Sequence, residues 1–275
     1  MTPLVLKFGG ELLEEPSRMA GVVAVVAPVA AGGTPLVVVH GGGKEIDAAL
    51  AAAGVEKRQV EGLRITDEAT LDIVVSVLAG AVNTRLVAAL SAAGTHAVGL
   101  TGADGASALS DVAPPHRTVE GRAVDLGRVG IPAAGADMRL LHTLLRDRFV
   151  PVVASIGVDG RGRLLNVNAD TMAGHLAGRL RARRLVIAGS TAGVLDDAGR
   201  TIPVLDPASI GQLVSGGTAT AGMIAKLRAC EQALSGGVDD VLIVDGRDQN
   251  ALRAAASGGV PAAATRVVAT VGTRS

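Results

Sequence analysis

Short apolar runs that end in glycine, each followed by an Ala- and Leu-rich stretch, constrain the fold of this chain most. Residues 3–8 (PLVLKF) end at a pair of glycines, and residues 35–40 (PLVVVH) end at three glycines. Strands that are apolar throughout are typical of a parallel sheet covered by helices on both faces. The alternation continues along the chain. We therefore predict an α/β fold, a three-layer α/β/α sandwich around a mainly parallel central sheet.

Local patterns predict the elements of this sandwich. Thr66 is expected to cap a helix that runs to about residue 93, because two acidic residues follow it in the first turn. Residues 107–130 are polar and punctuated by Gly and Pro, which indicates hairpins or a lid. A further hairpin is expected around residues 196–199 (DDAG). Other predicted strands are 97–101, 150–156, 184–188, 241–244 and 266–269, and other predicted helices are 17–31, 44–53, 137–148, 168–181, 208–215, 221–235 and 249–256.

The composition excludes several classes of protein. Lys and Arg number 26, Asp and Glu also 26, and aromatic residues make up 1%. A neutral chain almost without aromatic rings lacks the basic surface and the stacking platforms of a general nucleic-acid binder. At 48% apolar residues it is not disordered. The single Cys230 excludes an internal disulfide and fits a reducing compartment.

No targeting or membrane segment is expected. Lys7 interrupts the first apolar run, whereas a signal peptide places its charge before a longer one. The most apolar segment, residues 19–31, is too short to span a bilayer and contains Pro28. We predict a cytoplasmic protein with neither a membrane nor a nucleic acid as partner.

The two glycine loops are candidate phosphate sites. Glycine allows backbone N–H groups to approach an anion, and a following helix adds partial positive charge. A tight turn explains either loop alone equally well, but two loops after neighbouring parallel strands favour a ligand at that sheet edge. The P-loop, dinucleotide and serine-hydrolase motifs are absent. The five histidines show no metal-ligand spacing, and each is expected in the core or on the surface.

Three charged residues occupy suggestive positions. Lys7 ends an apolar strand, Asp170 lies in the first turn of a predicted helix, and Lys226 lies inside another helix. Taken singly, each has an ordinary explanation, as a snorkelling strand end, a dipole-favoured carboxylate and an exposed helix lysine. Their significance depends on the sequence around them.

Nine stretches, in order along the chain, resemble the acetylglutamate kinases of the amino-acid kinase superfamily. The glycine loops and the last lysine stretch are common to the superfamily, whereas GLRIT and NVNAD are much more particular to acetylglutamate kinases. The stretches are 6–10 (LKFGG), 38–43 (VVHGGG), 62–66 (GLRIT), 98–102 (VGLTG), 124–130 (VDLGRVG), 151–157 (PVVASIG), 166–170 (NVNAD), 222–226 (GMIAK) and 244–246 (VDG).

The resemblance implies that ATP, with Mg²⁺ held mainly by the nucleotide, phosphorylates the γ-carboxylate of N-acetyl-L-glutamate in the second step of arginine biosynthesis. A carboxylate is already a nucleophile at neutral pH, so no general base is needed, and the difficulty is charge. The resemblance implies one domain, with residues 1–180 binding the acceptor and 181–275 the nucleotide. The implied roles are catalytic for Lys7, Lys226 and Asp170, substrate-binding for Gly42, Gly43, Arg64 and Asn166, and phosphate- or nucleotide-binding for Gly9, Gly10, Gly41, Gly222 and Met223, with no metal ligand.

Two departures from the family pattern concern the nucleotide. Ser190 stands where the family usually has Asp, and Ala221 replaces the first glycine of Gly-Gly-Met, adding a methyl that could crowd a phosphate. The chain begins its first strand at about residue 3, without the preceding helix of arginine-inhibited hexamers, so a homodimer that arginine does not inhibit is expected. Two alternatives stay open: a kinase for carrier-protein-bound aminoadipate or glutamate, and a non-catalytic amino-acid sensor.

Overall fold

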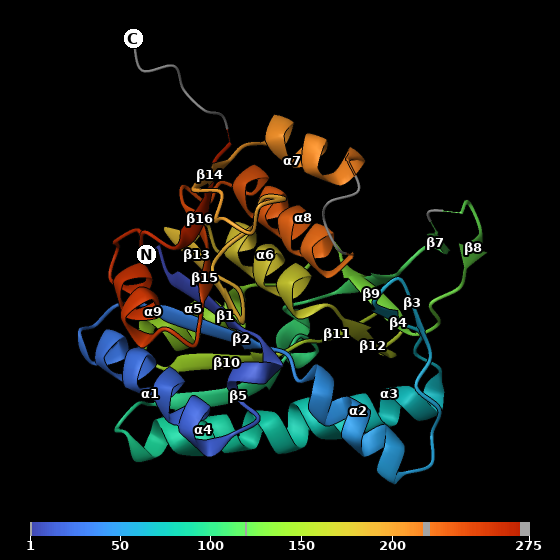
Figure 1. Ribbon diagram of the computed structural model, residues 1–275. Helices are drawn as coiled ribbons and strands as arrows, with labels where there is room; N and C mark the ends of the chain where they lie inside the picture. Colours follow the sequence, from blue (N-terminus) through green and yellow to red (C-terminus); the bar gives the residue numbers. More distant parts are fainter. Residues whose placement is uncertain (1, 119, 217–220, 270–275) are drawn as a thin grey trace.

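A mainly parallel sheet forms the centre of the molecule. The structure is a computed structural model that describes residues 2–118, 120–216 and 221–269, except for the side chain of Ala221. Within them the central sheet has eight strands in the order β14-β16-β15-β13-β1-β2-β10-β5, and every neighbouring pair is parallel except β15 with β16 (Figure 1). The predicted fold class is confirmed. The strands are β1 (Leu4–Phe8), β2 (Leu36–His40), β5 (Ala97–Thr101), β10 (Val150–Ala154), β13 (Arg184–Gly189), β14 (Val204–Leu205), β15 (Val241–Asp245) and β16 (Ala264–Val267).

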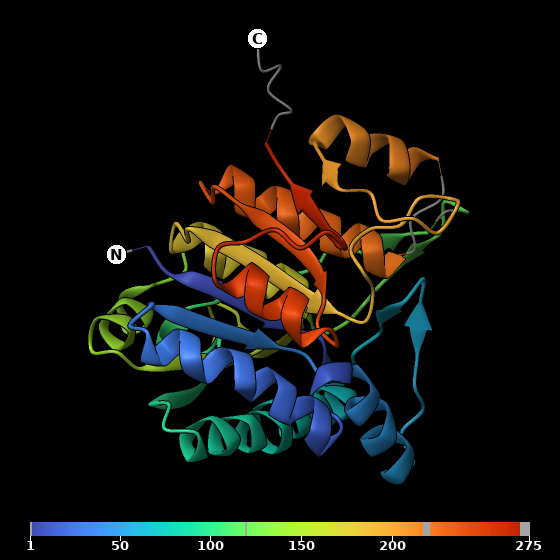
Figure 2. The same cartoon turned by 60° about the vertical axis from the view of Figure 1, so that its left-hand side comes forward.

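Two helical layers cover the sheet, and β1 shows why. Leu4, Leu6 and Phe8 lie in one apolar core with residues of α1, α4 and α9, while Val5 lies in a second core with residues of α5, α6 and α8. Figures 1 and 2 show helices on both faces of the sheet. Because side chains alternate along a strand, Lys7 follows Val5 to the α6 and α8 face. The helices are α1 (Pro16–Ala31), α4 (Asn83–Ala92), α5 (Arg139–Arg146), α6 (Ala169–Arg179), α7 (Pro207–Ser215), α8 (Ala221–Ser235) and α9 (Gln249–Ala256).

Smaller elements surround the carboxyl ends of β1 and β2 (Figure 1). They include a four-stranded sheet in the order β11-β12-β9-β6 and the hairpins β3–β4 and β7–β8. The second hairpin and the bridge between Leu195 and Thr201 confirm the two predicted hairpin regions. These elements are η1 (Gly10–Leu12), α2 (Gly43–Ala52), β3 (Gln59–Val60), β4 (Leu63–Arg64), α3 (Glu68–Val75), η2 (Ser76–Val82), η3 (Asp104–Ala106), β6 (Ser110–Val112), β7 (His116–Arg117), β8 (Ala123–Val124), β9 (Val129–Pro132), β11 (Ile156–Val158) and β12 (Leu164–Val167).

Two local predictions were wrong. Residues 150–156 are not one strand: β10 ends at Ala154, and Ile156 begins β11, which pairs with β12 in the smaller sheet. The helix cap is Asp67 and not Thr66, because the Asp67 carboxylate accepts the N–H of Thr70 at 2.9 Å. Thr66 is buried, and its own N–H donates to the Leu126 carbonyl. In both places pairing with distant residues overrides the local pattern.

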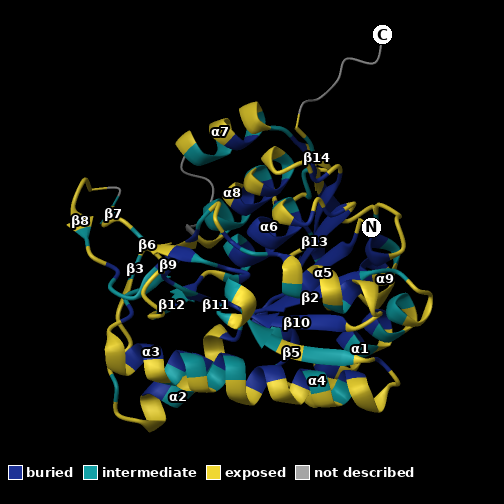
Figure 3. Cartoon of the chain, turned by 180° about the vertical axis from the view of Figure 1, so that it is seen from behind, coloured by how far each residue is buried: buried dark blue, intermediate teal, exposed yellow. Residues whose placement is uncertain are grey.

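The longest helix runs from Glu68 to Ala92 through α3, the π-helical η2 and α4. By length and composition alone these 25 residues could cross a membrane, and 33% of the most apolar window is buried inside the molecule. Leu71, Val74 and Leu86 are among the residues that it buries. Figure 3 shows buried and exposed residues interleaved along it beneath the sheet. In this fold the helix is therefore part of the helical layer over the sheet.

Candidate active site

The carboxyl ends of β1, β2 and β13 meet at one edge of the central sheet. Phe8 pairs with His40 on one side and with Ala188 on the other, so the chain order reverses around β1. Ligands of open parallel sheets bind at such reversal points. The two glycine loops touch here backbone to backbone: a Cβ on Gly10 would lie 2.6 Å from the Cα of Gly42. Only glycine fits this approach.

The backbone N–H groups of the glycine loops divide into two sets. The N–H of Gly9 donates to the Ala188 carbonyl at 3.0 Å, and that of Gly41 to the Phe8 carbonyl at 3.3 Å, so both continue the sheet. Among the described residues, no hydrogen bond uses the N–H of Gly10, Gly42 or Gly43. Free N–H groups at a helix start attract anions. Those three groups are therefore the ones without an acceptor among the described residues at this edge, while the N–H groups of Gly9 and Gly41 belong to the sheet.

Lys7, Asp170 and Lys226 form one buried charge cluster. Lys7 Nζ lies 2.8 Å from Asp170 Oδ1, and Lys226 Nζ lies 3.4 Å from Asp170 Oδ2. Asn168 caps α6 by accepting the N–H of Asp170 at 2.9 Å, which fixes the carboxylate in the first turn. The three side chains are 8%, 10% and 13% exposed in chain order. The exposed-lysine explanation of Lys226 is therefore wrong.

The cluster carries one more positive than negative charge. Burial would raise the pKa of Asp170, but the charges of Lys7 and Lys226 outweigh it and hold that pKa below its ordinary value. Burial and the charge of Lys7 lower the pKa of Lys226, against the pull of Asp170. A carboxylate between two ammonium groups neutralises only one of them. The site is therefore suited to receive a further anion.

A close helix crossing sets the position of Lys226. A Cβ on Gly174 of α6 would lie 2.5 Å from the Ala229 carbonyl oxygen of α8, and a Cβ on Gly178 would lie 3.2 Å from the Cα of Gly236. Small residues at a crossing let two helices approach closely. The crossing brings Lys226 beside the first turn of α6.

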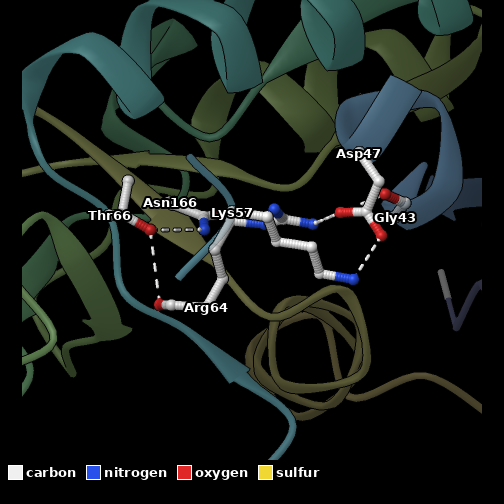
Figure 4. Close-up of polar contacts among 6 residues, drawn as sticks. All are labelled: Gly43, Asp47, Lys57, Arg64, Thr66 and Asn166. Atoms are coloured by element: carbon white, nitrogen blue, oxygen red, sulfur yellow. Dashed lines mark hydrogen bonds and ion pairs between the residues drawn. The ribbon is translucent and has the colours of Figure 1, made fainter. Parts of the chain in front are cut away.

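Arg64 lies at the centre of a second cluster, shown in Figure 4. Its Nη2 contacts Asp47 Oδ1 at 2.5 Å and the Gly43 carbonyl at 3.4 Å, and Lys57 Nζ contacts Asp47 Oδ2 at 2.6 Å. Burial would raise the pKa of Asp47, but Lys57 and Arg64 outweigh it and lower that pKa. Arg64 Nη1 is buried and makes no hydrogen bond within the described part of the chain. One side of the guanidinium thus has no hydrogen-bond acceptor among the described residues.

Asn166 completes this cluster from β12. Its Nδ2 donates to Thr66 Oγ1 at 3.1 Å, which places it beside Arg64 (Figure 4). Sequence reasoning missed Asp47 and Lys57. For Asp47 a signal existed, because it lies one helical turn after Gly43. Lys57 carried no signal, since its exposed loop shows no motif.

His40 anchors the second glycine loop. It is buried, and burial lowers its pKa to about 4, although its hydrogen bond to Gly41 opposes this. Its Nδ1 lies 3.1 Å from the Gly41 carbonyl, and its Nε2 lies 3.0 Å from Asn83 Nδ2, which also donates to the Val152 carbonyl. The network assigns a neutral ring that donates from Nδ1 and accepts at Nε2. His40 is thus a core residue, as expected, but one that positions the loop.

The nucleotide residues implied by the resemblance are less enclosed. Gly222 is exposed with no atom within 4 Å of a Cβ built on it, and Met223 packs partly against the core. Ser190 is exposed directly after β13. The expectation that the Ala221 methyl crowds a phosphate lies outside the described residues.

Comparisons with known proteins identify the family of this chain. The model of the amino acid kinase family matches residues 2–245. Acetylglutamate kinase from Oleidesulfovibrio alaskensis is 41% identical over 251 residues, covering 90% of this chain and 84% of that protein. Acetylglutamate kinase from Sphingopyxis alaskensis is 40% identical over 253 residues, with 90% and 83% covered.

The fold is shared with solved structures. The crystal structure of smu.665 from Streptococcus mutans UA159 superposes with a TM-score of 0.79 at 25% identity, covering 97% of this chain and 98% of that one. The chain therefore belongs to the amino acid kinase family and, within it, to the acetylglutamate kinases.

Proposed function

We propose that this protein transfers the γ-phosphoryl group of ATP to the γ-carboxylate of N-acetyl-L-glutamate, the second step of arginine biosynthesis. The buried cluster of Lys7, Asp170 and Lys226 is the observation that carries the proposal. Its excess positive charge lies at the sheet edge where the N–H groups of Gly10, Gly42 and Gly43 have no acceptor among the described residues. Similarity to curated acetylglutamate kinases over 90% of the chain supports this acceptor.

The reaction needs charge stabilisation more than proton transfer. The acceptor carboxylate is ionised at neutral pH and attacks the phosphorus directly, so no side chain has to remove a proton. Two anions must approach, and charge on the transferred group must be stabilised. Lys7 from β1 and Lys226 from α8 provide that charge, and Asp170 holds both amines in place before substrate arrives.

Separate groups hold the two substrates. Arg64 Nη1 fits the α-carboxylate, and Gly42, Gly43 and Asn166 fit the other polar groups of the acceptor. Gly10, Gly222 and Met223 lie on the nucleotide side, with Gly9 and Gly41 shaping the loops. We propose that residues 1–180 bind the acceptor and residues 181–275 bind ATP, with Gly10 of the first part reaching the phosphates. Bound Mg²⁺, held mainly by the nucleotide, neutralises part of the phosphate charge.

The alternative functions are not favoured. The curated relatives are acetylglutamate kinases, which disfavours a carrier-protein-bound acceptor. A non-catalytic sensor does not require two buried lysines around one carboxylate. The cluster therefore argues for an enzyme, and the relatives argue for N-acetylglutamate as its acceptor.

We also propose a homodimer that works in the cytoplasm. β5 is the edge strand of the central sheet, and within the described residues only β10 pairs with it. Such an edge offers unpaired backbone groups to a second copy. The apolar helix from Glu68 to Ala92, only partly buried, lies beside it. The buried, unpaired Cys230 is consistent with a reducing compartment.

An ADP-release assay with several acceptors tests the function. We expect ADP release with N-acetylglutamate and only background with glutamate, aspartate, carbamate and UMP. A glutamate response equal to that of N-acetylglutamate would contradict the acceptor assignment. Binding of N-acetylglutamate without any ADP release would contradict the enzymatic function.

A further inference from the structure

Glu11 places an unused carboxylate at the phosphate end of the site. It lies in η1, one residue after the first glycine pair, and its side chain folds back over the loop. A Cβ on Gly9 would collide with both carboxylate oxygens of Glu11. A Cβ on Gly189, at the end of β13, would lie 3.5 Å from Glu11 Oε1 and 3.9 Å from Lys226 Nζ. The absence of a side chain on Gly9 and Gly189 thus leaves room for the Glu11 carboxylate on the side of the loop that faces Lys226.

Nothing in the described part of the chain neutralises this carboxylate directly. Neither of its oxygens has a hydrogen bond or an ion pair with a described residue, although the other carboxylates near the site, those of Asp47, Asp170 and Asp245, all have cationic partners. At longer range its charge reaches Arg247, whose pKa is raised mainly by Asp245 and in part by Glu11. The side chain is half-buried. Its charge therefore faces the region proposed for the nucleotide.

An uncompensated carboxylate at this place weakens the binding of a nucleotide that carries no metal ion. Like charges in a partly buried site repel more strongly than they do in water. A divalent cation between the carboxylate and the phosphates turns the repulsion into attraction. Mg²⁺ prefers oxygen ligands and is typically bound by one or two carboxylates together with substrate phosphates.

The donor set fits a metal that arrives with the nucleotide. Among the described residues, no group of three or more His, Cys, Asp or Glu side chains could hold a metal ion. One free carboxylate beside Lys226 is too little to bind free Mg²⁺. It is enough to contribute one contact to an ion whose other ligands are phosphate oxygens and water.

We propose that Glu11 contacts the Mg²⁺ of the bound magnesium–nucleotide complex, directly or through a coordinated water, and that it selects this complex against metal-free nucleotide. The inference rests on the proposed function, because it requires ATP at this edge of the sheet. It makes Glu11 a metal contact, whereas the family resemblance implies no metal ligand.

Calorimetric titration with AMP-PNP, a non-hydrolysable ATP analogue, tests the inference in Mg²⁺ and in EDTA. The wild-type protein is expected to bind the magnesium complex about tenfold or more tightly than the metal-free analogue. Glu11→Gln removes the charge at nearly constant size. It is expected to bind metal-free AMP-PNP several-fold more tightly than wild type, so that most of the Mg²⁺ dependence disappears.

The control is Glu15→Gln, which removes the same charge from an exposed residue that pairs with Arg18. It should keep the wild-type Mg²⁺ dependence. Glu11→Asp, which retains a carboxylate, should recover part of it. A tighter metal-free complex in Glu11→Gln also cannot come from misfolding, which would weaken binding under both conditions.

The outcomes separate the two proposals. If wild type and Glu11→Gln respond equally to Mg²⁺ while both bind AMP-PNP, the role of Glu11 is wrong and the proposed function stands. If the wild-type protein binds no AMP-PNP under either condition, the proposed function fails and the Glu11 contact fails with it.

Discussion

Lys7 is a charged residue inside an apolar strand. Its neighbours in β1 are fully buried aliphatic and aromatic side chains, and Lys7 itself is 6% exposed. A buried ammonium is costly unless an anion compensates it. Asp170 supplies that anion at 2.8 Å and at the same time contacts Lys226. The structure thus retains a charge at a position where an apolar side chain would pack without this cost.

Replacing either lysine should reduce turnover far more than acceptor binding. Lys7→Ala and Lys226→Ala are each expected to lower kcat by about 10²–10³, the scale for loss of one preorganised stabilising charge. The KM for N-acetylglutamate should change less. Lys44→Ala is the control, because its side chain is 73% exposed. A kcat within a few-fold of wild type would remove that lysine from the catalytic residues.

His40 should make folding stability depend on pH. Its pKa is about 4 in the folded protein against 6.5 as the reference, because burial disfavours the charged ring. Between these values the unfolded chain binds a proton that the native chain does not, so stability falls as pH falls from 6.5 towards 4. His175, whose pKa is also lowered to about 4, chiefly by burial, adds to the same slope.

Urea unfolding at several pH values measures this slope. His40→Gln should reduce it by up to about 1.4 kcal/mol per pH unit within that window. The remaining slope belongs to His175 and other groups. His142→Gln, at an exposed position of α5, serves as the control and should retain the wild-type slope. A His40→Gln protein with an unchanged slope would show that His40 is not buried as a neutral ring.

At the scale of elements, α6 and α8 act as one unit. Asp170 begins α6 and Lys226 lies in α8, so their distance depends on how closely the two helices cross. The crossing is close because Gly174 and Gly178 have no side chains. Gly174 therefore packs against the Ala229 carbonyl, and Gly178 packs against Gly236. The helix pair therefore links core packing directly to the geometry of the charge cluster.

Gly174→Ala tests this link. The added methyl must push the helices apart, which is expected to cost about 1–3 kcal/mol of stability and to lower kcat by moving Lys226 from Asp170. Gly211→Ala is the matched control in α7, where a Cβ meets no atom within 4 Å. It should stabilise the protein by roughly 0.5–1 kcal/mol, because alanine is the better helix former. If Gly174→Ala keeps the wild-type kcat, the helix crossing does not determine the position of Lys226 relative to Asp170.

At the scale of the whole molecule, the sheet has two unequal edges. β14 at one edge has only two residues, whereas β5 at the other has five and carries no charged side chain. Short or charged edges resist pairing, and long neutral edges invite it. The surface beside β5 is thus the part of the described molecule best suited to a second copy.

Light scattering coupled to gel filtration tests the dimer. The wild-type protein should show about twice the 27.3 kDa mass of one chain. Thr84→Glu places a charge in the groove between α4 and β5, where Thr84 is exposed, and should shift the protein to a monomer. Ala198→Glu adds the same charge to an exposed turn far along the chain and should leave the mass unchanged. A monomeric wild-type protein would overturn the dimer.

Much of the fold could be predicted because its signals are local. The apolar runs of β1 and β2 and the glycines after them report on neighbours a few residues away, and the structure places strands and loops there. The errors at Thr66 and Ser155 have the opposite cause. There the backbone bonds to residues far along the chain: the N–H of Thr66 donates to the Leu126 carbonyl, and the Ser155 carbonyl accepts the N–H of Val167. No local pattern reports those bonds.

The candidate site divides in the same way. By itself the sequence determined the parallel α/β sandwich, the two glycine loops and, through family resemblance, the identities of Lys7, Asp170, Lys226, Arg64 and Asn166. Only the tertiary structure decided that the lysines share one buried carboxylate. It also revealed the partners of Arg64, the anchoring of the loop by His40 and the free carboxylate of Glu11. The physical reason is that charge and burial at the site arise from residues that are distant in sequence, and only the folded sheet edge brings these together.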